Sequence, residues 1–531
     1  MDVPALLIAE KFIDRDACSD RSVATVIFAL LALASLLPTL LTPIPAMGDY
    51  LNHLARMYLL SEMSTIKANP YYEAAWAFYP NLAMDLMVPR IARLIGAENA
   101  TRLFLLFSQL LIIGGALALE WVVKRRVHLA GFAALLFLYC LPFTWGFVNF
   151  ECSLGIALWG IAAYLCAAEQ PAPVRFVVNT AFVLVLFTAH FFSLGIYGAT
   201  LGLYESWRAF DRKVTCGDAA LRLVTLAIPV VALLVVMRLT AGSVGSEGTF
   251  WYFNYKLLWP FFIMNGYSMA ISGASAIVLM VALYVAARFG MLKLQPAGIW
   301  VATGFALLYL TIPPRLFGTA FADIRVLPAA ALILPAFCSL SLPSRRWTMA
   351  ALAIVGGITL ANLAVVLVVW LSYRADYSAL IQSFQKIDRG SKILIGTSGE
   401  GDDPPFKDLT QYPMYYAPTL AVHYANAFVA NVFTEAGKQP IQARAEVRRL
   451  AIPYGGPVPI RLLSAIAAAQ ITASDNVAFI RTWYLDYDYL YLLGTGVANP
   501  LPGMLEELDR SERFALYKIR RTPSSVPEEL R

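Results

Sequence analysis

Apolar runs of about the thickness of a bilayer constrain this chain more strongly than any other feature. Eleven of them lie near residues 22–43, 101–122, 129–147, 152–168, 175–189, 191–207, 221–239, 267–288, 297–312, 326–342 and 347–371. A spanning helix needs about 20 apolar residues, and fewer when it packs inside a bundle. Only 14% of the 531 residues are charged, whereas soluble domains carry about 25%. The sequence therefore predicts a polytopic α-helical membrane protein with about eleven transmembrane helices.

The charged joins between the runs alternate, and this pattern predicts how the chain crosses the membrane. The basic residues of every second join are Lys124 to Arg126, Arg175, Arg208 to Lys213, Arg288 with Lys293, and Arg345 with Arg346. By the positive-inside rule these joins are cytoplasmic. The stretch 175–207 is compatible with one long helix or with two, and a split at His190 keeps the alternation intact.

The predicted locations of the two chain ends follow from the number of spans. Charged residues precede the first run, which predicts a retained anchor rather than a cleavable signal peptide. An odd number of spans from a cytoplasmic N-terminus puts the C-terminal segment outside. We therefore expect a multi-pass protein of the plasma membrane, of the bacterial inner-membrane kind.

The composition changes near residue 375, where charges become frequent and apolar runs shorten. Three runs have the length of strands, 392–395, 489–493 and 514–519, and 460–471 has a helical pattern. The segment of about 150 residues is large enough to bury its own core. We predict a transmembrane domain over 1–374, with a long first outer loop at about 44–100, and a water-facing outer α/β domain over 375–531.

A polar segment directly follows the first apolar run. Asp49, Asn52, His53 and Arg56 fall on one stripe when this segment is wound as a helix, because helical residues advance by about 100°. Such a helix is expected to lie along the membrane surface. The first loop holds two amphipathic stretches of this kind, at about 49–62 and 82–95.

Asp49 is the candidate catalytic residue of this stripe. A partly desolvated carboxylate can act as a general base towards a hydroxyl group, whereas its structural alternative is an N-cap. His53, Arg56 and Asn52 are candidates for binding substrate, and for His53 and Arg56 a phosphate is the expected contact. Packing for His53 and snorkelling for Arg56 are the alternatives.

Further ionisable and polar residues collect at the outer joins. These candidates for substrate binding are Asp85, Asn149, Glu151, His190, Arg315, Asp323 and Arg325. Ionisable groups at the rim of a helix bundle are functional candidates by default, although local hydrogen bonds and ion pairs explain them equally well. Two guanidinium groups at one outer join, Arg315 and Arg325, suit a phosphate or diphosphate.

Other site chemistries find little support. Six cysteines and four histidines form no metal-binding pattern, so no metal ligand is assigned. The net charge of +6 fits basic cytoplasmic joins better than a nucleic-acid surface. We expect no nucleic-acid partner.

Together these features resemble the GT-C superfamily, membrane glycosyltransferases that use polyprenyl-phosphate sugars. The superfamily includes the protein O-mannosyltransferases and the aminoarabinose lipid A transferases. The resemblance rests on Asp49 just after the first span, in a long outer loop with two interfacial helices. The polar ends of later helices and the outer C-terminal domain add to it.

The resemblance implies an inverting transfer at the outer face of the membrane. Asp49 would take a proton from a lipid, glycan or protein acceptor while a polyprenyl phosphate departs from the lipid-linked sugar donor. Many members carry a second acid beside the first or two positions from it, but Tyr50 and Leu51 occupy those places here. Metal dependence is left open, with Asp85 and Glu151 as available substitutes.

Two other functions compete with transfer. A transporter or flippase for a lipid-linked sugar would show repeats and ionisable groups near the middle of the bilayer. This sequence shows no repeat, and its ionisable groups gather at one rim. A non-catalytic membrane scaffold with a partner-binding outer domain is the third interpretation.

Overall fold

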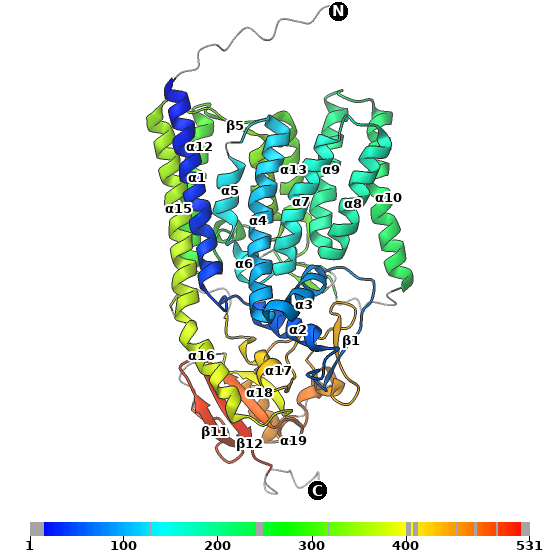
Figure 1. Cartoon of the computed structure of the whole chain (residues 1–531), viewed down its shortest axis with the longest axis vertical. Coiled ribbons are helices and arrows are strands. Elements are labelled where there is room, and N and C mark those ends of the chain that lie inside the picture. Colours follow the sequence, from blue (N-terminus) through cyan, green and yellow to red (C-terminus); the bar gives the residue numbers. More distant parts are fainter. Residues whose placement is uncertain are drawn as a thin grey trace, which may run out of the picture.

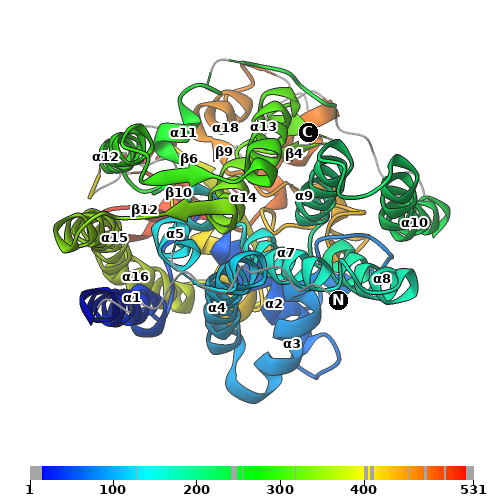
Figure 2. The ribbon, with the colours of Figure 1, turned by 90° about the horizontal axis from the view of Figure 1, so that it is seen from above.

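The chain forms a bundle of long helices above a smaller α/β layer (Figure 1). The computed structural model describes residues 15–127, 129–240, 248–253, 255–316, 318–399, 405–406, 412–452, 454–471, 475–494 and 498–521. Seen along the bundle in Figure 2, α1 (Arg15–Leu41) and α15 (Arg345–Ser372) lie at one edge, and α8 (Ala172–Ala189) and α10 (Cys216–Thr240) at another.

All eleven predicted spans coincide with helical segments. Besides those four they are α4 (Ala97–Lys124), α5 (Ala130–Phe137) with α6 (Leu141–Thr144), α7 (Val148–Cys166), α9 (Phe191–Phe210), α12 (Met269–Arg288), α13 (Pro296–Thr311) and α14 (Val326–Ile333). Within the described residues, seven helices are long and apolar enough to cross a membrane. The predicted fold class is confirmed, and His190 does divide 175–207 into two helices because its backbone is extended.

Two predicted spans differ from the structure in their detail. The run 129–147 is broken between α5 and α6, where Pro142 lies in the first turn of α6 and the Leu141 amide donates to the Ile263 carbonyl. The run 326–342 is helical only to Phe337, and its end forms β5 (Cys338–Leu340), paired with β2 (Leu292–Leu294).

The basic joins all lie at one end of the bundle. Lys124 ends α4, Arg208 lies in the last turn of α9, and Arg345 begins α15, all at the end remote from the α/β layer (Figure 1). The alternation of the joins is therefore confirmed. Which end faces the cytoplasm stays a prediction, and residues 1–14, on which the predicted anchor partly depends, lie outside the described residues.

Both amphipathic stretches of the first loop form helices between the bundle and the α/β layer. They are α2 (Tyr50–Glu62) and α3 (Ala83–Ile95). The polar stripe of α2 is partly covered by another segment of the chain. Asn52 and Arg56 are fully buried, because the C-terminal segment packs over this side of the helix.

The C-terminal layer is built on one mixed sheet. Its strand order is β11 (Leu505–Arg510), β12 (Phe514–Ile519), β10 (Tyr489–Leu493), β6 (Lys392–Thr397) and β7 (Phe428–Val429), with β9 (Val458–Pro459) also on β6. The strands β6, β10 and β12 and the helix α18 (Ile460–Ala467) confirm the predicted elements. The remaining helices of this part are α16 (Arg374–Ser383), α17 (Ala421–Tyr424) and α19 (Trp483–Asp486).

The first loop is part of this lower layer. Its strand β1 (Tyr72–Ala74) pairs antiparallel with β8 (Ile441–Ala443) of the C-terminal segment. Smaller elements at this end are α11 (Trp259–Phe262) and the hairpin of β3 (Arg315–Leu316) and β4 (Thr319–Ala320). Residues far apart in the sequence therefore meet around α2.

Candidate active site

The backbone fixes Asp49 at the junction of the two layers. The Asp49 amide donates to the Trp145 carbonyl at 2.8 Å, and the Gly48 amide donates to the Thr144 carbonyl at 3.1 Å. Gly146 has φ of +87°, and a Cβ there would lie 2.8 Å from the amide nitrogens of Asp49 and Tyr50. Only glycine combines this conformation with so close an approach, so the α6–α7 turn holds Asp49 in place.

The Asp49 side chain is largely enclosed by protein, and its carboxylate does not cap the helix. It stands at the N-cap of α2 but accepts no capping hydrogen bond there, and it keeps some accessible surface. Burial raises the pKa of this carboxyl to about 7, and the charges of Arg325 and Arg56 oppose the rise. A carboxyl that titrates near neutral pH is suited to general-base chemistry.

Arg325 is a cation that interacts electrostatically with Asp49. It is 5% exposed, and its Nε and Nη1 have no hydrogen-bond partner within the described part of the chain. Its Cζ lies 4.5 Å from the ring centre of Phe147 and 5.7 Å from that of Phe150. Burial lowers the pKa of Arg325 to about 10, while the charges of Asp49, Glu151 and Asp323 oppose that shift. A buried guanidinium with unused donors is suited to an anionic ligand.

Glu151 and His190 complete the group around Arg325. Glu151 is 1% exposed in the first turn of α7 and accepts a hydrogen bond from the Cys140 thiol at 3.4 Å. The His190 Nδ1 accepts from the Phe192 amide at 3.2 Å and so caps α9. The structure therefore gathers four sequence-predicted residues, Asp49, Glu151, His190 and Arg325, from four separate joins.

Three other predicted residues make bonds within the protein. Arg56 donates through Nε and Nη2 to the two Asp85 carboxylate oxygens at 2.7 and 3.0 Å, and through Nη1 to Gln439. The Asn52 amide group donates to the Asn431 carbonyl at 2.8 Å and accepts from the Phe433 amide at 2.9 Å. These bonds attach the C-terminal layer to α2 and α3.

Asn149 also connects elements of the protein. Its Oδ1 accepts from the Met84 amide at 2.8 Å, and its Nδ2 donates to the Asn81 carbonyl at 2.8 Å. This side chain thereby attaches the start of α3 to the start of α7. The structure gives Asn149, like Arg56, Asp85 and Asn52, a part in positioning, and their substrate contacts stay predictions.

Asp323 has a partner that the sequence did not indicate. The Lys256 ammonium lies 3.6 Å from the Asp323 carboxylate, donates to the Tyr309 carbonyl at 2.7 Å and is 1% exposed. Lys256 follows an aromatic run, and a single cation there looks like an interfacial anchor. Arg315, in β3, is half-buried with its Cζ 6.0 Å from the ring centre of Phe250, outside the group around Asp49.

His53 lies one turn beyond Asp49 on α2. It is 8% exposed, its ring packs edge-on against Phe433 at 5.8 Å, and its Nδ1 has no hydrogen-bond partner in the described part of the chain. Burial and the charge of Arg56 lower its pKa. His53 is therefore a neutral imidazole at neutral pH, able to donate or accept one hydrogen bond beside Asp49.

Metal ligands are not grouped at this site. Among the described residues no three histidine, cysteine, aspartate or glutamate side chains converge on a point that could hold a metal ion. Arg325 interacts electrostatically with both Asp49 and Glu151. Arg325 thus supplies a positive charge to this site from the protein itself.

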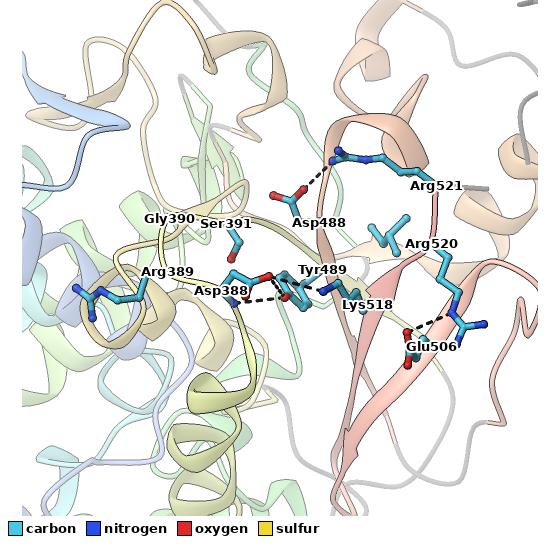
Figure 3. A pocket seen from close by; sticks show the side chains of 11 residues that line it. Asp388, Arg389, Gly390, Ser391, Asp488, Tyr489, Glu506, Lys518, Arg520 and Arg521 are labelled. Carbon is cyan, nitrogen blue, oxygen red and sulfur yellow. Dashed lines mark hydrogen bonds and ion pairs between the residues drawn. The ribbon is translucent and has the colours of Figure 1, made fainter. Parts of the chain in front are cut away.

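A separate cavity of about 660 Å³ opens on the α/β layer (Figure 3). Six of its seven charged residues, all but Arg389, form pairs: Arg521 lies 2.7 Å from Asp488, Arg520 lies 3.2 Å from Glu506, and Lys518 lies 3.7 Å from Asp388. Since these charges are already neutralised on an exposed surface, the cavity is a weaker candidate than the buried group around Asp49.

Comparison with known proteins gives two solved structures of similar outline. They are ArnT from Cupriavidus metallidurans in the apo state, with a TM-score of 0.48, and the same protein bound to undecaprenyl phosphate, with 0.46. Each is 13% identical and covers 95% of this chain and 98% or 99% of the other. No family model matches, and neither does any curated protein.

Proposed function

We propose that this protein is a membrane glycosyltransferase that moves a sugar from a polyprenyl-phosphate-linked donor to an acceptor hydroxyl. One observation carries the proposal: Asp49, uncapped and with its pKa raised to about 7, interacts electrostatically with Arg325, a buried guanidinium with two nitrogens that have no hydrogen-bond partner among the described residues. A base beside an unpaired cation is what transfer from a phosphate leaving group needs.

The reaction is a single displacement. The Asp49 carboxylate takes the proton of the acceptor hydroxyl, and the acceptor oxygen forms a bond to the anomeric carbon. The bond from that carbon to the phosphate oxygen breaks on the opposite face, which inverts the configuration. The departing polyprenyl phosphate keeps the electron pair, and its negative charge is met by Arg325.

The placement of these groups favours an enzyme over a transporter. Asp49, Glu151, His190 and Arg325 all lie at helix ends that meet the α/β layer. A transporter would need its binding groups near the middle of the bilayer, reachable from both sides. A site at one end serves a donor held in the membrane and an acceptor that stays on one side.

Polyprenyl phosphate is released whichever sugar is transferred, so its release tests the proposal. The purified protein in lipid nanodiscs is given a membrane extract containing polyprenyl-phosphate sugars and acceptors, and released polyprenyl phosphate is measured by mass spectrometry. We expect Asp49→Asn to lower release by about 10³-fold, because a general base contributes about 10²- to 10⁴-fold. Asp218→Asn, which changes an exposed acid at the remote end of α10, is the matched control.

Two results would contradict the proposal. Release by Asp49→Asn at the wild-type rate removes Asp49 as the base. No release by the wild-type protein, under conditions where it is folded and the extract holds both substrates, removes the transferase itself.

A further inference from the structure

Five aromatic rings form a continuous series from the surface of the α/β layer to Asp49. Tyr412 stacks on Tyr415 at 6.3 Å between ring centres, and Tyr415 meets Tyr416 edge-on at 5.7 Å. Tyr416 meets Phe433 at 5.1 Å, and Phe433 meets His53 at 5.8 Å. We call these five side chains the aromatic track.

The two ends of the aromatic track differ in character. Its outer end, Tyr412, is 45% exposed. At its inner end Tyr416 interacts electrostatically with Asp49, whose charge and the burial of the phenol raise the pKa of Tyr416. His53 ends the track with a buried Nδ1 that has no partner. The aromatic track therefore extends from an exposed ring to a residue one helical turn from Asp49, and the Nδ1 of that residue has no hydrogen-bond partner among the described residues.

The inner part of the aromatic track is held by dedicated contacts. Asn52 of α2 accepts from the Phe433 amide at 2.9 Å and so places this ring against His53. Gly455 has φ of +77°, and a Cβ there would lie 2.6 Å from the Phe433 ring. The Asn52 hydrogen bond and the close approach of Gly455 thus fix the position of the Phe433 ring. A residue that only fills space would not need both contacts.

The chemistry of the aromatic track fits a carbohydrate. A pyranose ring presents flat patches of C–H groups that pack on aromatic faces, and hydroxyls that bond to polar tips such as phenols. Among the described residues the hydroxyls of Tyr415 and Tyr416 have no hydrogen-bond partner, and both side chains are half-buried. The aromatic track thus offers ring faces and unused hydroxyls together.

We propose that the aromatic track is the acceptor subsite and that the acceptor is a glycan. The inference rests on the proposed function and adds to it the class of acceptor and its route. The polyprenyl chain of the donor arrives through the membrane, whereas the exposed Tyr412 belongs to the C-terminal segment that follows the last predicted span. His53 acts as a positioning residue that bonds the attacking sugar next to Asp49.

Binding of defined oligosaccharides tests the inference directly. Saturation-transfer NMR on the full-length protein in nanodiscs is recorded with maltopentaose and with chitotetraose. We expect contact with at least one of them, weakened about 3- to 10-fold by Tyr412→Ala and by Tyr415→Ala, since an aromatic contact contributes about 0.5–1.5 kcal/mol. Trp76→Ala removes a ring of similar exposure, 51%, outside the aromatic track and is expected to have no effect.

The same variants in the polyprenyl phosphate assay separate this inference from the transferase proposal. We expect Tyr412→Ala to raise the KM for the acceptor with kcat and the KM for the donor unchanged. If Asp49→Asn abolishes release but Tyr412→Ala leaves the acceptor KM unchanged, the aromatic track fails and the transferase stands. A change in donor KM alone, or no contact with either oligosaccharide, also overturns the aromatic track.

Discussion

Two aspartates at the junction of the layers interact with arginines, and they are used in opposite ways. Asp85 and Arg56 form a closed pair: both side chains are inaccessible, and all three guanidinium nitrogens of Arg56 bond to protein oxygens. Asp49 and Arg325 form an open pair, in which the carboxyl makes no cap bond and Nε and Nη1 of Arg325 are unused.

The difference separates a structural role from a chemical one. A buried charge costs several kcal/mol unless partners replace the water it has lost. The closed pair recovers this energy within the protein and attaches α2 to α3 and to Gln439. The open pair leaves part of it unrecovered, which is expected where an anionic ligand supplies the missing contacts.

Breaking the closed pair has the largest expected effect. Arg56→Ala leaves Asp85 buried without its partner, so the free energy of unfolding should fall by about 3–5 kcal/mol. Thermal unfolding in detergent measures the loss. The double variant Arg56→Met with Asp85→Leu removes both charges and is expected to regain most of the stability. A single variant as stable as the wild type would show that the pair is not closed.

Breaking the open pair should reduce the rate instead. Arg325→Gln is expected to lower polyprenyl phosphate release by about 10²- to 10³-fold, because a preorganised donor to a developing anion is worth about 2.7–4 kcal/mol. Its loss also removes a charge that lowers the pKa of Asp49, so the pH–rate profile should shift to higher pH. Arg346→Gln, an exposed cation in α15, is the control. An unchanged rate would exclude Arg325 as the phosphate contact.

A variant that moves Asp49 but keeps both charges of the open pair tests whether the position of Asp49 matters. Gly146→Ala pushes a Cβ into the Asp49 backbone, and a shift of about 1 Å costs about 10²-fold in rate. Gly195→Ala in α9 meets nothing within 4 Å and should keep full activity. Equal rates for both variants would show that Asp49 tolerates displacement.

The smallest effect concerns pH and stability. Because the pKa of Asp49 rises from 3.8 to about 7 on folding, the folded state holds a proton that the unfolded state has lost between these values. The wild-type protein therefore loses stability as pH rises from about 4 to 7. Asp49→Asn lacks this pH dependence. The melting temperature of the variant minus that of the wild type should therefore increase with pH and become constant above about pH 7. A constant difference would mean that Asp49 titrates normally.

The sequence was a good guide to the elements at this junction. Helices were predicted at 49–62 and 82–95 and begin within one residue of those positions, because their apolar spacing is set locally. Asp49, Glu151, His190 and Arg325 were each singled out as polar groups beside apolar runs. Lys256 and the aromatic track were missed, since neither a lone lysine nor a Tyr412–Tyr416 cluster says what it faces.

The sequence does not show which of these polar groups are paired in the folded protein. Asn52, Arg56 and Asp49 fall on one stripe, and their spacing does not show which of them is paired within the protein. The C-terminal segment, nearly 400 residues along the chain, takes up Asn52 and Arg56 through Asn431 and Gln439 but leaves Asp49 open. Periodicity and charge determined where the polar groups lie along the chain, because they act over a few residues. Only tertiary packing decided which charges are neutralised, because burial and pairing depend on segments that meet in space.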